Sequence, residues 1–418
     1  MARDYLTGDR EQQFLLPPDM RDWLPPDHLV WFVVEVMERL DLSAFQVRAA
    51  DPRGRRRYDP AVMATVLIYA YAVGERSSRR IERRCLEDVG FRVAAGNLAP
   101  DHTTLSRFVK DHADAFDDLF VQVLELAGRA GLGRVGTIYL DGTKIAADVS
   151  SSKARTRAQL EAEVARITRE ARARDEAEDD EFGDGTGEEL PDELADPDTR
   201  RARLDAALEE LADVEAKRRS NSRSRKPPRV NVTDSQARIM KGPRGWGWGY
   251  NAQAVVDDDG LIVAADVTNS PVDNHAYLPM IDQACDNVAA AGLDPPDTAV
   301  ADAGYWDSTN ITASTNPRPR PVIPPTPSKR RPKLALRGPI PTAATVPQRM
   351  ERFLATKTGA AIYAKRKGRV EPVFGTIKTS RRIDRWRCRG LDAARHEWRL
   401  AATTHNLLKI WRAITIAT

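Results

Sequence analysis

Two short apolar runs in this chain each end in an aspartate. The first run is Thr137–Asp141, followed by Gly142, and the second is Thr298–Asp302, followed by an Ala-Gly pair. Runs of this length and composition predict buried strands that deliver both aspartates to the carboxyl edge of one sheet. Starting a turn is the commoner role for either aspartate taken alone. Carboxylates gathered at such an edge bind hard cations such as Mg²⁺.

A third carboxylate, Glu371, lies in a basic stretch far along the chain. It directly precedes Pro372, and Lys378 follows seven residues after it. Because Pro372 lacks an N–H, we expect a helix to begin or kink there, which places Glu371 near a helix amino end. The helix dipole favours an ionised carboxylate at that position. A spacing of seven residues puts Glu371 and Lys378 on nearly the same helix face.

The residues around these acids resemble a known family. The segments that carry the resemblance are Asp141-Gly-Thr-Lys144, Asp302-Ala-Gly-Tyr-Trp306 and the stretch from Tyr363 to Lys378. In combination they resemble bacterial insertion-sequence transposases of the DDE class, close to the IS-five and IS-eleven-eighty-two type groups. The resemblance extends from about Leu15 to Arg412, nearly the whole chain.

The resemblance implies an RNase H-like catalytic domain that cuts and joins DNA with two Mg²⁺ ions, for which Mn²⁺ can substitute. It implies that the metal ligands and catalytic residues are Asp141, Asp302 and Glu371. It also implies that three residues contact DNA phosphates, namely Tyr363, Arg366 and Lys378. Four residues separate Arg366 from Glu371 where related groups commonly have three, so Lys367 is an alternative to Arg366.

The implied partners are the terminal inverted repeats of the element and the target DNA, both double-stranded. Synapsis of two ends implies a homodimer or a higher oligomer in the DNA complex. The longest apolar run, residues 61–73, has thirteen residues. Because a membrane-spanning helix needs roughly 18 or more, we expect no membrane partner. Three cysteines without paired spacing argue against zinc and against a disulfide framework, and fit the bacterial cytoplasm.

We expect an α/β fold, an RNase H-like mixed sheet flanked by helices, with an N-terminal all-α domain and a helical insertion. The expected parts are a helical DNA-binding domain at 1–125, a catalytic domain at 130–150 and 231–418, and an inserted helical hairpin at 151–230. Apolar residues at positions 0, +4 and +7 predict the two hairpin helices: Leu160, Val164, Ile167 and Leu204, Leu208, Leu211. The block at 175–198 has thirteen acids and no base, which predicts a disordered acidic tip.

Further elements of the catalytic domain follow from turn signals and periodicity. Two strands at 249–256 and 261–267 form a predicted hairpin around an Asp-Asp-Asp-Gly turn. Helices are expected at 274–291, 307–313 and 348–366, with a strand at 321–323. Trp246 and Trp248 fall in an expected flexible loop, where they either stack on an unpaired base or pack on the strand.

The N-terminal region contains a candidate DNA-binding helix that begins after Asp101. Its residues Thr103, Arg107 and Lys110 share one polar face opposite an apolar one. Two helices joined by a short turn also occur in any helical bundle, so a purely structural role for this helix is the alternative. Candidate phosphate contacts lie on the preceding helix at Arg79, Arg80, Arg83 and Arg84.

Charge distribution is more informative than the net charge of +3. Residues 365–399 contain twelve Lys or Arg and four acids, a local net of +8. Such a stretch attracts phosphates, although a solvated charged helix face is the plainer interpretation. Together with the family resemblance, these observations predict a transposase. The alternatives are an inactive or domesticated DNA-binding regulator, a simple Mg²⁺-dependent DNA nuclease, or a recombinase that links covalently to DNA.

Overall fold

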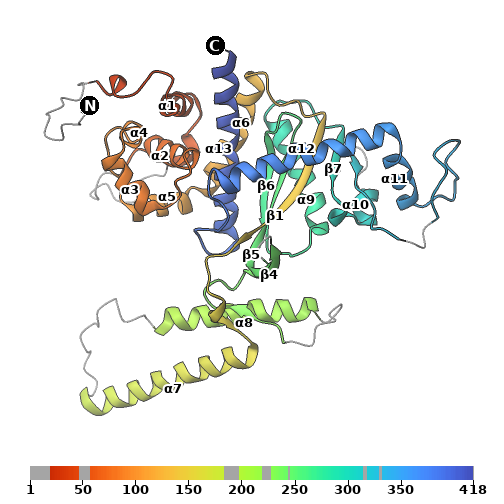
Figure 1. The fold of residues 1–418 in the computed structure, drawn as a ribbon. Coiled ribbons are helices and arrows are strands. Elements are labelled where there is room, and N and C mark those ends of the chain that lie inside the picture. Colours follow the sequence, from red (N-terminus) through yellow and green to blue (C-terminus); the bar gives the residue numbers. More distant parts are fainter. Residues whose placement is uncertain are drawn as a thin grey trace, which may run out of the picture.

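The computed structural model describes residues 19–46, 57–182, 197–218, 227–242, 245–313, 318–328 and 332–417. The disordered tip expected at 175–198 lies mostly at 183–196, outside the described residues, whereas its flanks at 175–182 and 197–198 are helical. The α/β class and the N-terminal helical region are as predicted, and helices cover a mixed central sheet (Figure 1). In the ranges described, no helix is both long and apolar enough to cross a bilayer.

The central sheet has six strands: β1 (Thr137–Ala146), β4 (Arg238–Gly242), β5 (Gly245–Val256), β6 (Ile262–Thr268), β7 (Thr298–Ala301) and β8 (Arg320–Val322). Strand β1 lies in the middle, antiparallel to β5 and parallel to β7. Strand β8 continues the parallel side, while β6 and β4 pair with β5 on the other. This order confirms the RNase H-like arrangement. It puts the carboxyl end of β7 beside Leu140 and Asp141 in the middle of β1, because β1 does not end at Asp141 as expected but continues to Ala146.

The N-terminal region consists of α1 (Leu29–Arg39), α2 (Pro60–Ala72), α3 (Ser78–Glu87), α4 (Val89–Ala94), α5 (His102–Asp111) and α6 (Ala113–Arg129). Its helix starts follow the expected capping chemistry. Asp59 accepts a 2.8 Å hydrogen bond from the Ala61 N–H with Pro60 at the first helical position, and Asp101 caps α5 through the Thr104 N–H. One continuous apolar core joins these helices to the catalytic sheet.

The remaining helices of the catalytic part are α9 (Tyr277–Ala290), α10 (Ser308–Ala313), α11 (Val346–Leu354), α12 (Lys357–Thr379) and α13 (Leu391–Ala417). Helix α13 packs between the N-terminal helices and β6. Its Asn406 side chain both accepts from the Ile262 N–H at 2.9 Å and donates to the Ile262 carbonyl at 2.8 Å. Trp398 donates to the Gln253 carbonyl at 2.7 Å, so α13 is tied to two strands by buried polar groups.

The inserted hairpin consists of α7 (Arg157–Phe182) and α8 (Pro197–Arg218), joined to the body through the short strands β2 (Ala154–Arg155) and β3 (Val230–Asn231). It projects beyond the β4 side of the central sheet (Figure 1), and Glu210 of α8 pairs with Arg238 of β4. The expected apolar positions form its own small core, with Leu160, Leu204 and Leu211 fully buried. The boundaries of the domains as such stay a prediction.

Helix α12 corrects the expectation that Glu371 lies near a helix amino end. The helix runs through Pro372, with Glu371 well inside it. Pro372 removes one backbone hydrogen bond, at a cost of about 3 kcal/mol. The helix nevertheless continues because its apolar face packs against the sheet through Val370, Val373, Phe374 and Ile377.

Two further expectations were wrong in detail. The single helix expected at 348–366 is divided, because α11 ends at Leu354 and Thr356 caps the start of α12 through the Gly359 N–H. The expected flexible loop around the two tryptophans is instead the β4–β5 hairpin. In it, Trp248 is buried and Trp246 is 71% exposed.

Candidate active site

Strands β1 and β7 bring Asp141 and Asp302 together. Leu140 lies opposite Ala301 in the parallel register, and each aspartate is the next residue along its strand. Asp302 turns into a short 3₁₀ helix that it caps by accepting a 2.8 Å hydrogen bond from the Gly304 N–H. Burial raises the pKa of Asp141, and the neighbouring charge of Asp302 raises that pKa further, against the opposing effect of Arg366. Two adjacent parallel strands thus bring two interacting carboxylates together, although only Asp302 follows a strand end.

Arg366 holds Asp141 in place. Its Nη1 donates a 2.8 Å hydrogen bond to Asp141 Oδ2, while Asp141 Oδ1 accepts from the Gly142 N–H at 2.8 Å. The two side chains are 16% and 19% exposed, so water only partly screens the pair. Tyr363 is half-buried about one helical turn before Arg366. Lys367 was the alternative to Arg366 for the position beside the acids. Arg366 occupies that position, because it is the residue that contacts Asp141.

Lys378 reaches the same strand from the other end of α12. Its Nζ donates to Thr143 Oγ1, and burial lowers its pKa. Thr143 is two residues beyond Asp141, so both side chains leave the same face of β1. Helix α12 therefore presents two cations to the strand that carries Asp141.

Glu371 lies between those two cations along α12, and its side chain is exposed. Across the described ranges, no three His, Cys, Asp or Glu side chains gather closely enough to hold a metal ion. Glu371 therefore does not complete a ligand set with Asp141 and Asp302 in this conformation. Its role as the third ligand stays a prediction.

The donor chemistry of the two aspartates fits a divalent cation. Both offer carboxylate oxygens, the ligands that Mg²⁺ prefers. Burial raises the pKa of Asp141, and a neighbouring positive charge opposes that effect. Arg366 supplies that charge here, and a cation bound at Asp141 Oδ2 would take its place.

Asp273 also lies at this edge of the sheet, although the sequence patterns did not single it out. Its Oδ1 accepts hydrogen bonds from Lys144 Nζ at 2.8 Å, Asn251 Nδ2 at 2.6 Å and Gln253 Nε2 at 3.2 Å. Two amide side chains within an otherwise apolar strand, β5, were the available signal. The side chains of Asn251 and Gln253 lie over Gly142. A Cβ added to that glycine would lie only 2.5 Å from Gln253 Nε2.

Asp273 and Asp302 flank the same glycine. A Cβ built on Gly304 would lie 3.0 Å from Asp302 Oδ1 and 3.5 Å from Asp273 Oδ2. The buried Tyr305 hydroxyl donates to Gln253 Oε1. Burial raises the pKa of Tyr305 far above its usual range, and the charges of Asp273, Asp141 and Asp302 add to the increase. Three aspartates therefore surround one buried tyrosine.

The predicted DNA-binding face of α5 is exposed. Thr103, Arg107 and Lys110 are all exposed, and Lys110 also borders a cavity. Thr103 donates to Asp101, so its hydroxyl contributes to the helix cap. The DNA contacts proposed for Arg107 and Lys110 stay predictions.

Two protein-family models match the chain. Residues 18–111 match a family described as Transposase domain (DUF772), and residues 212–407 match the Transposase DDE domain. Asp302 and Glu371 fall inside the second match, whereas Asp141 lies between the two, separated from the second by most of the α7–α8 hairpin. No curated protein and no solved structure matches the chain.

Proposed function

We propose that this chain, which belongs to the DDE-class insertion-sequence transposases, cuts the phosphodiester at the ends of its element and joins the freed 3′ hydroxyl to target DNA. The observation that carries the proposal is that Asp302, just after the end of β7, lies beside Asp141 on the parallel strand β1. Carboxylates at that position suit metal-assisted hydrolysis and transesterification of phosphodiesters.

Transposases of this class use divalent metal ions. We propose two Mg²⁺ ions, with Mn²⁺ as a substitute, held by Asp141, Asp302 and Glu371. When bound, such ions activate the attacking oxygen and neutralise the leaving one. For Glu371 to join the two aspartates, its exposed side chain on α12 would have to turn toward β1.

The surrounding residues orient the reacting DNA. Arg366 keeps Asp141 in one rotamer before the reaction, and with Tyr363 it can contact a phosphate near the scissile bond. Lys378, fixed by Thr143, places a second positive charge on the same side of β1. These cations neutralise phosphate charge where the backbone approaches the acids.

DNA binding is a property that the family implies. We propose that the double-stranded partners are the terminal inverted repeats and target DNA, with Arg107 and Lys110 among the contacts to the element end. Two ends must be held together for joining, so we propose a homodimer or a larger assembly in the DNA complex. We place this reaction in the bacterial cytoplasm, where the chromosome is.

The products made from DNA distinguish this proposal from its alternatives. Purified protein is incubated with Mg²⁺, a labelled duplex carrying an element end and a supercoiled target plasmid. A transposase yields labelled plasmid, whereas a simple nuclease yields cut duplex without joined product. A regulator that has lost catalysis shifts the duplex on a native gel and leaves it uncut. A labelled protein adduct that disappears in Tyr363→Phe would indicate a covalent recombinase instead.

A further inference from the structure

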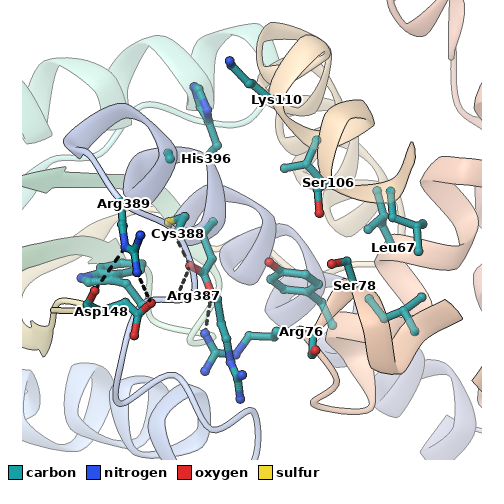
Figure 2. A pocket seen from close by; sticks show the side chains of 18 of the residues that line it. Leu67, Arg76, Ser78, Ser106, Lys110, Asp148, Arg387, Cys388, Arg389 and His396 are labelled. Carbon is teal, nitrogen blue, oxygen red and sulfur yellow. Dashed lines mark hydrogen bonds and ion pairs between the residues drawn. The ribbon is translucent and has the colours of Figure 1, made fainter. Parts of the chain in front are cut away.

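A cavity of about 1300 Å³ separates the N-terminal helices from the segment that joins α12 to α13. Arg79 of α3 and Lys110 of α5 line one side. The other side is lined by the arginine loop, residues 382–389, which contributes Arg382, Arg385, Arg387 and Arg389. Figure 2 shows Arg387 and Arg389 on one side of the cavity, and Ser78 and Ser106 of the N-terminal helices on the other. This site is separate from the acids of β1 and β7.

A buried clamp fixes the shape of the arginine loop. The Arg76 guanidinium donates to the carbonyls of Arg382 and Arg385 and pairs with Glu397 of α13. The two paired side chains are only 4% and 5% exposed. The second Glu397 oxygen accepts from the Arg387 N–H at 3.1 Å. The loop is thus held from the N-terminal side and from α13 together.

The backbone of the loop is strained at Arg382, whose φ is +56°. A non-glycine residue in this region costs of order 1–3 kcal/mol and persists only where its surroundings fix it. The bond from Arg76 to the Arg382 carbonyl provides that fixation. Ile383 and Trp386 are buried, and Arg382, Arg385 and Arg387 are exposed. The loop therefore anchors on apolar side chains and turns its arginines outward.

Most acids that line the cavity are already neutralised. Glu397 pairs with Arg76, Asp148 lies 3.6 Å from Arg389, and Asp392 lies 3.0 Å from Arg395. The fourth acid, Asp384, lies near Lys378 and favours its charged form. No ion pair within the described part of the chain involves Arg79, Lys110, Arg382, Arg385 or Arg387. The cavity wall therefore carries uncompensated positive charge, which suits a polyanion.

The arginine loop is physically continuous with the strand that carries Asp141. Ala146 at the end of β1 donates to the Asp384 carbonyl at 3.3 Å and accepts from the Trp386 N–H at 2.9 Å. Ala146 is five positions beyond Asp141 along β1, a distance of about 17 Å at about 3.3 Å per residue. Because B-DNA rises 3.4 Å per base pair, that distance corresponds to about five base pairs.

We infer that the arginine loop and the facing ends of α3 and α5 form a phosphate-binding interface for duplex DNA, which engages the backbone about five base pairs from the bond cut at Asp141. This inference rests on the proposed function, because DNA is its occupant. Guanidinium groups suit phosphate oxygens, since they donate paired hydrogen bonds in a fixed plane. The contacts are to the backbone and carry no base specificity of their own.

The test measures the salt dependence of DNA binding. A short fluorescein-labelled duplex is titrated with protein in EDTA, and the affinity is followed by anisotropy over a range of NaCl concentrations. The double variant Arg385→Ala/Arg387→Ala should lower the slope of log affinity against log salt by about 1.8, because each lost phosphate contact contributes about 0.9. Both side chains are exposed and leave the Arg76 clamp intact, since that clamp uses only their backbone groups.

The matched control is Arg39→Ala/Arg129→Ala, two exposed arginines on α1 and α6 with side chains 70% and 74% exposed. Its slope should equal that of the wild type. An unchanged slope in the loop variant, or an equal fall in the control, would overturn the interface. Cleavage is not measured here, so an inactive enzyme would contradict the proposed function while leaving this result intact.

Discussion

Arg366 on α12 donates a 2.8 Å hydrogen bond to Oδ2 of Asp141 on β1. The contact joins two segments that are 225 residues apart in sequence, and it places the helix that carries Glu371 against the strand that carries the first acid. It also gives the half-buried carboxylate a positive neighbour. A metal ion at the proposed site would therefore compete with Arg366 for the same oxygen.

Removing Arg366 should increase the affinity of the site for divalent cations. In Arg366→Ala, Asp141 Oδ2 becomes free, and loss of a competing interaction of about 1 kcal/mol raises the affinity about fivefold. Calorimetric titration of the DNA-free protein with Mn²⁺ measures this effect. Arg369→Ala on the same helix, whose guanidinium lies 3.6 Å from Asp258, is the control and should bind Mn²⁺ like the wild type. An affinity for Mn²⁺ that is unchanged or lower in Arg366→Ala would contradict the competition.

Close packing of the central sheet should make Gly249 of β5 intolerant of a larger residue. Gly247, two positions earlier, should tolerate one. A Cβ on Gly249 would lie 2.4 Å from the Ile145 carbonyl oxygen of β1, which is backbone and cannot move aside. A Cβ on Gly247 would meet nothing within 4 Å. We expect Gly249→Ala to lower the free energy of unfolding by about 1–3 kcal/mol, typical of overpacking. Gly247→Ala should change it by less than about 0.5 kcal/mol. Urea unfolding measures the change in unfolding free energy of both variants. Equal changes would contradict the register of β5 against β1.

The turn between β5 and β6 should make stability depend on pH. Burial raises the pKa of Asp257 to about 7. Its Oδ1 accepts from the Asp259 and Leu261 N–H groups, while no residue described here bonds its Oδ2. The folded state thus keeps a proton that the unfolded state releases above pH 4, so stability falls as the pH rises from about 4 toward 7.

Asparagine cannot ionise, so the stability of Asp257→Asn does not fall between about pH 4 and pH 7 as that of the wild type does. Its stability relative to the wild type should therefore rise by about 1–4 kcal/mol between pH 5 and pH 8, measured as the difference in unfolding free energy. Asp41→Asn is the control, because the hydrogen bond from the Ser43 N–H lowers the pKa of the exposed Asp41, which lies far from Asp257 in the sequence. Its difference from the wild type should stay constant over the same pH range. A constant difference for Asp257→Asn as well would show that Asp257 titrates normally.

The sequence was sufficient to predict the sheet and two of its acids, because these depend on local patterns. Apolar runs ending in Asp141 and Asp302 predicted neighbouring strands, and the aspartates do meet. Arg366 and Lys378 were expected near the acids, and Arg366 does contact Asp141. In each case the pattern and the tertiary contacts favour the same structure.

Other features depend on contacts that no local pattern reveals. Pro372 predicted a helix start near Glu371, but tertiary packing of the apolar face of α12 keeps the helix intact. Asp273 was missed because its partners, Lys144, Asn251 and Gln253, come from strands distant in sequence. The Arg76–Glu397 clamp joins residues 321 positions apart and left no periodic signal.

The most direct measurement compares cleavage by Glu371→Gln with that by Asp141→Asn and Asp302→Asn, on a labelled duplex with an element end and Mg²⁺. Each change replaces the carboxylate of a proposed metal ligand by an uncharged amide of the same shape. The rate of cleavage should therefore fall about a thousandfold or more, reflecting several kcal/mol of lost charge stabilisation. Affinity for the duplex in EDTA should stay within about twofold of the wild type, because the phosphate contacts are intact. Cleavage at the wild-type rate by Glu371→Gln would exclude Glu371 from the site, and the same result for either aspartate would contradict the account as a whole.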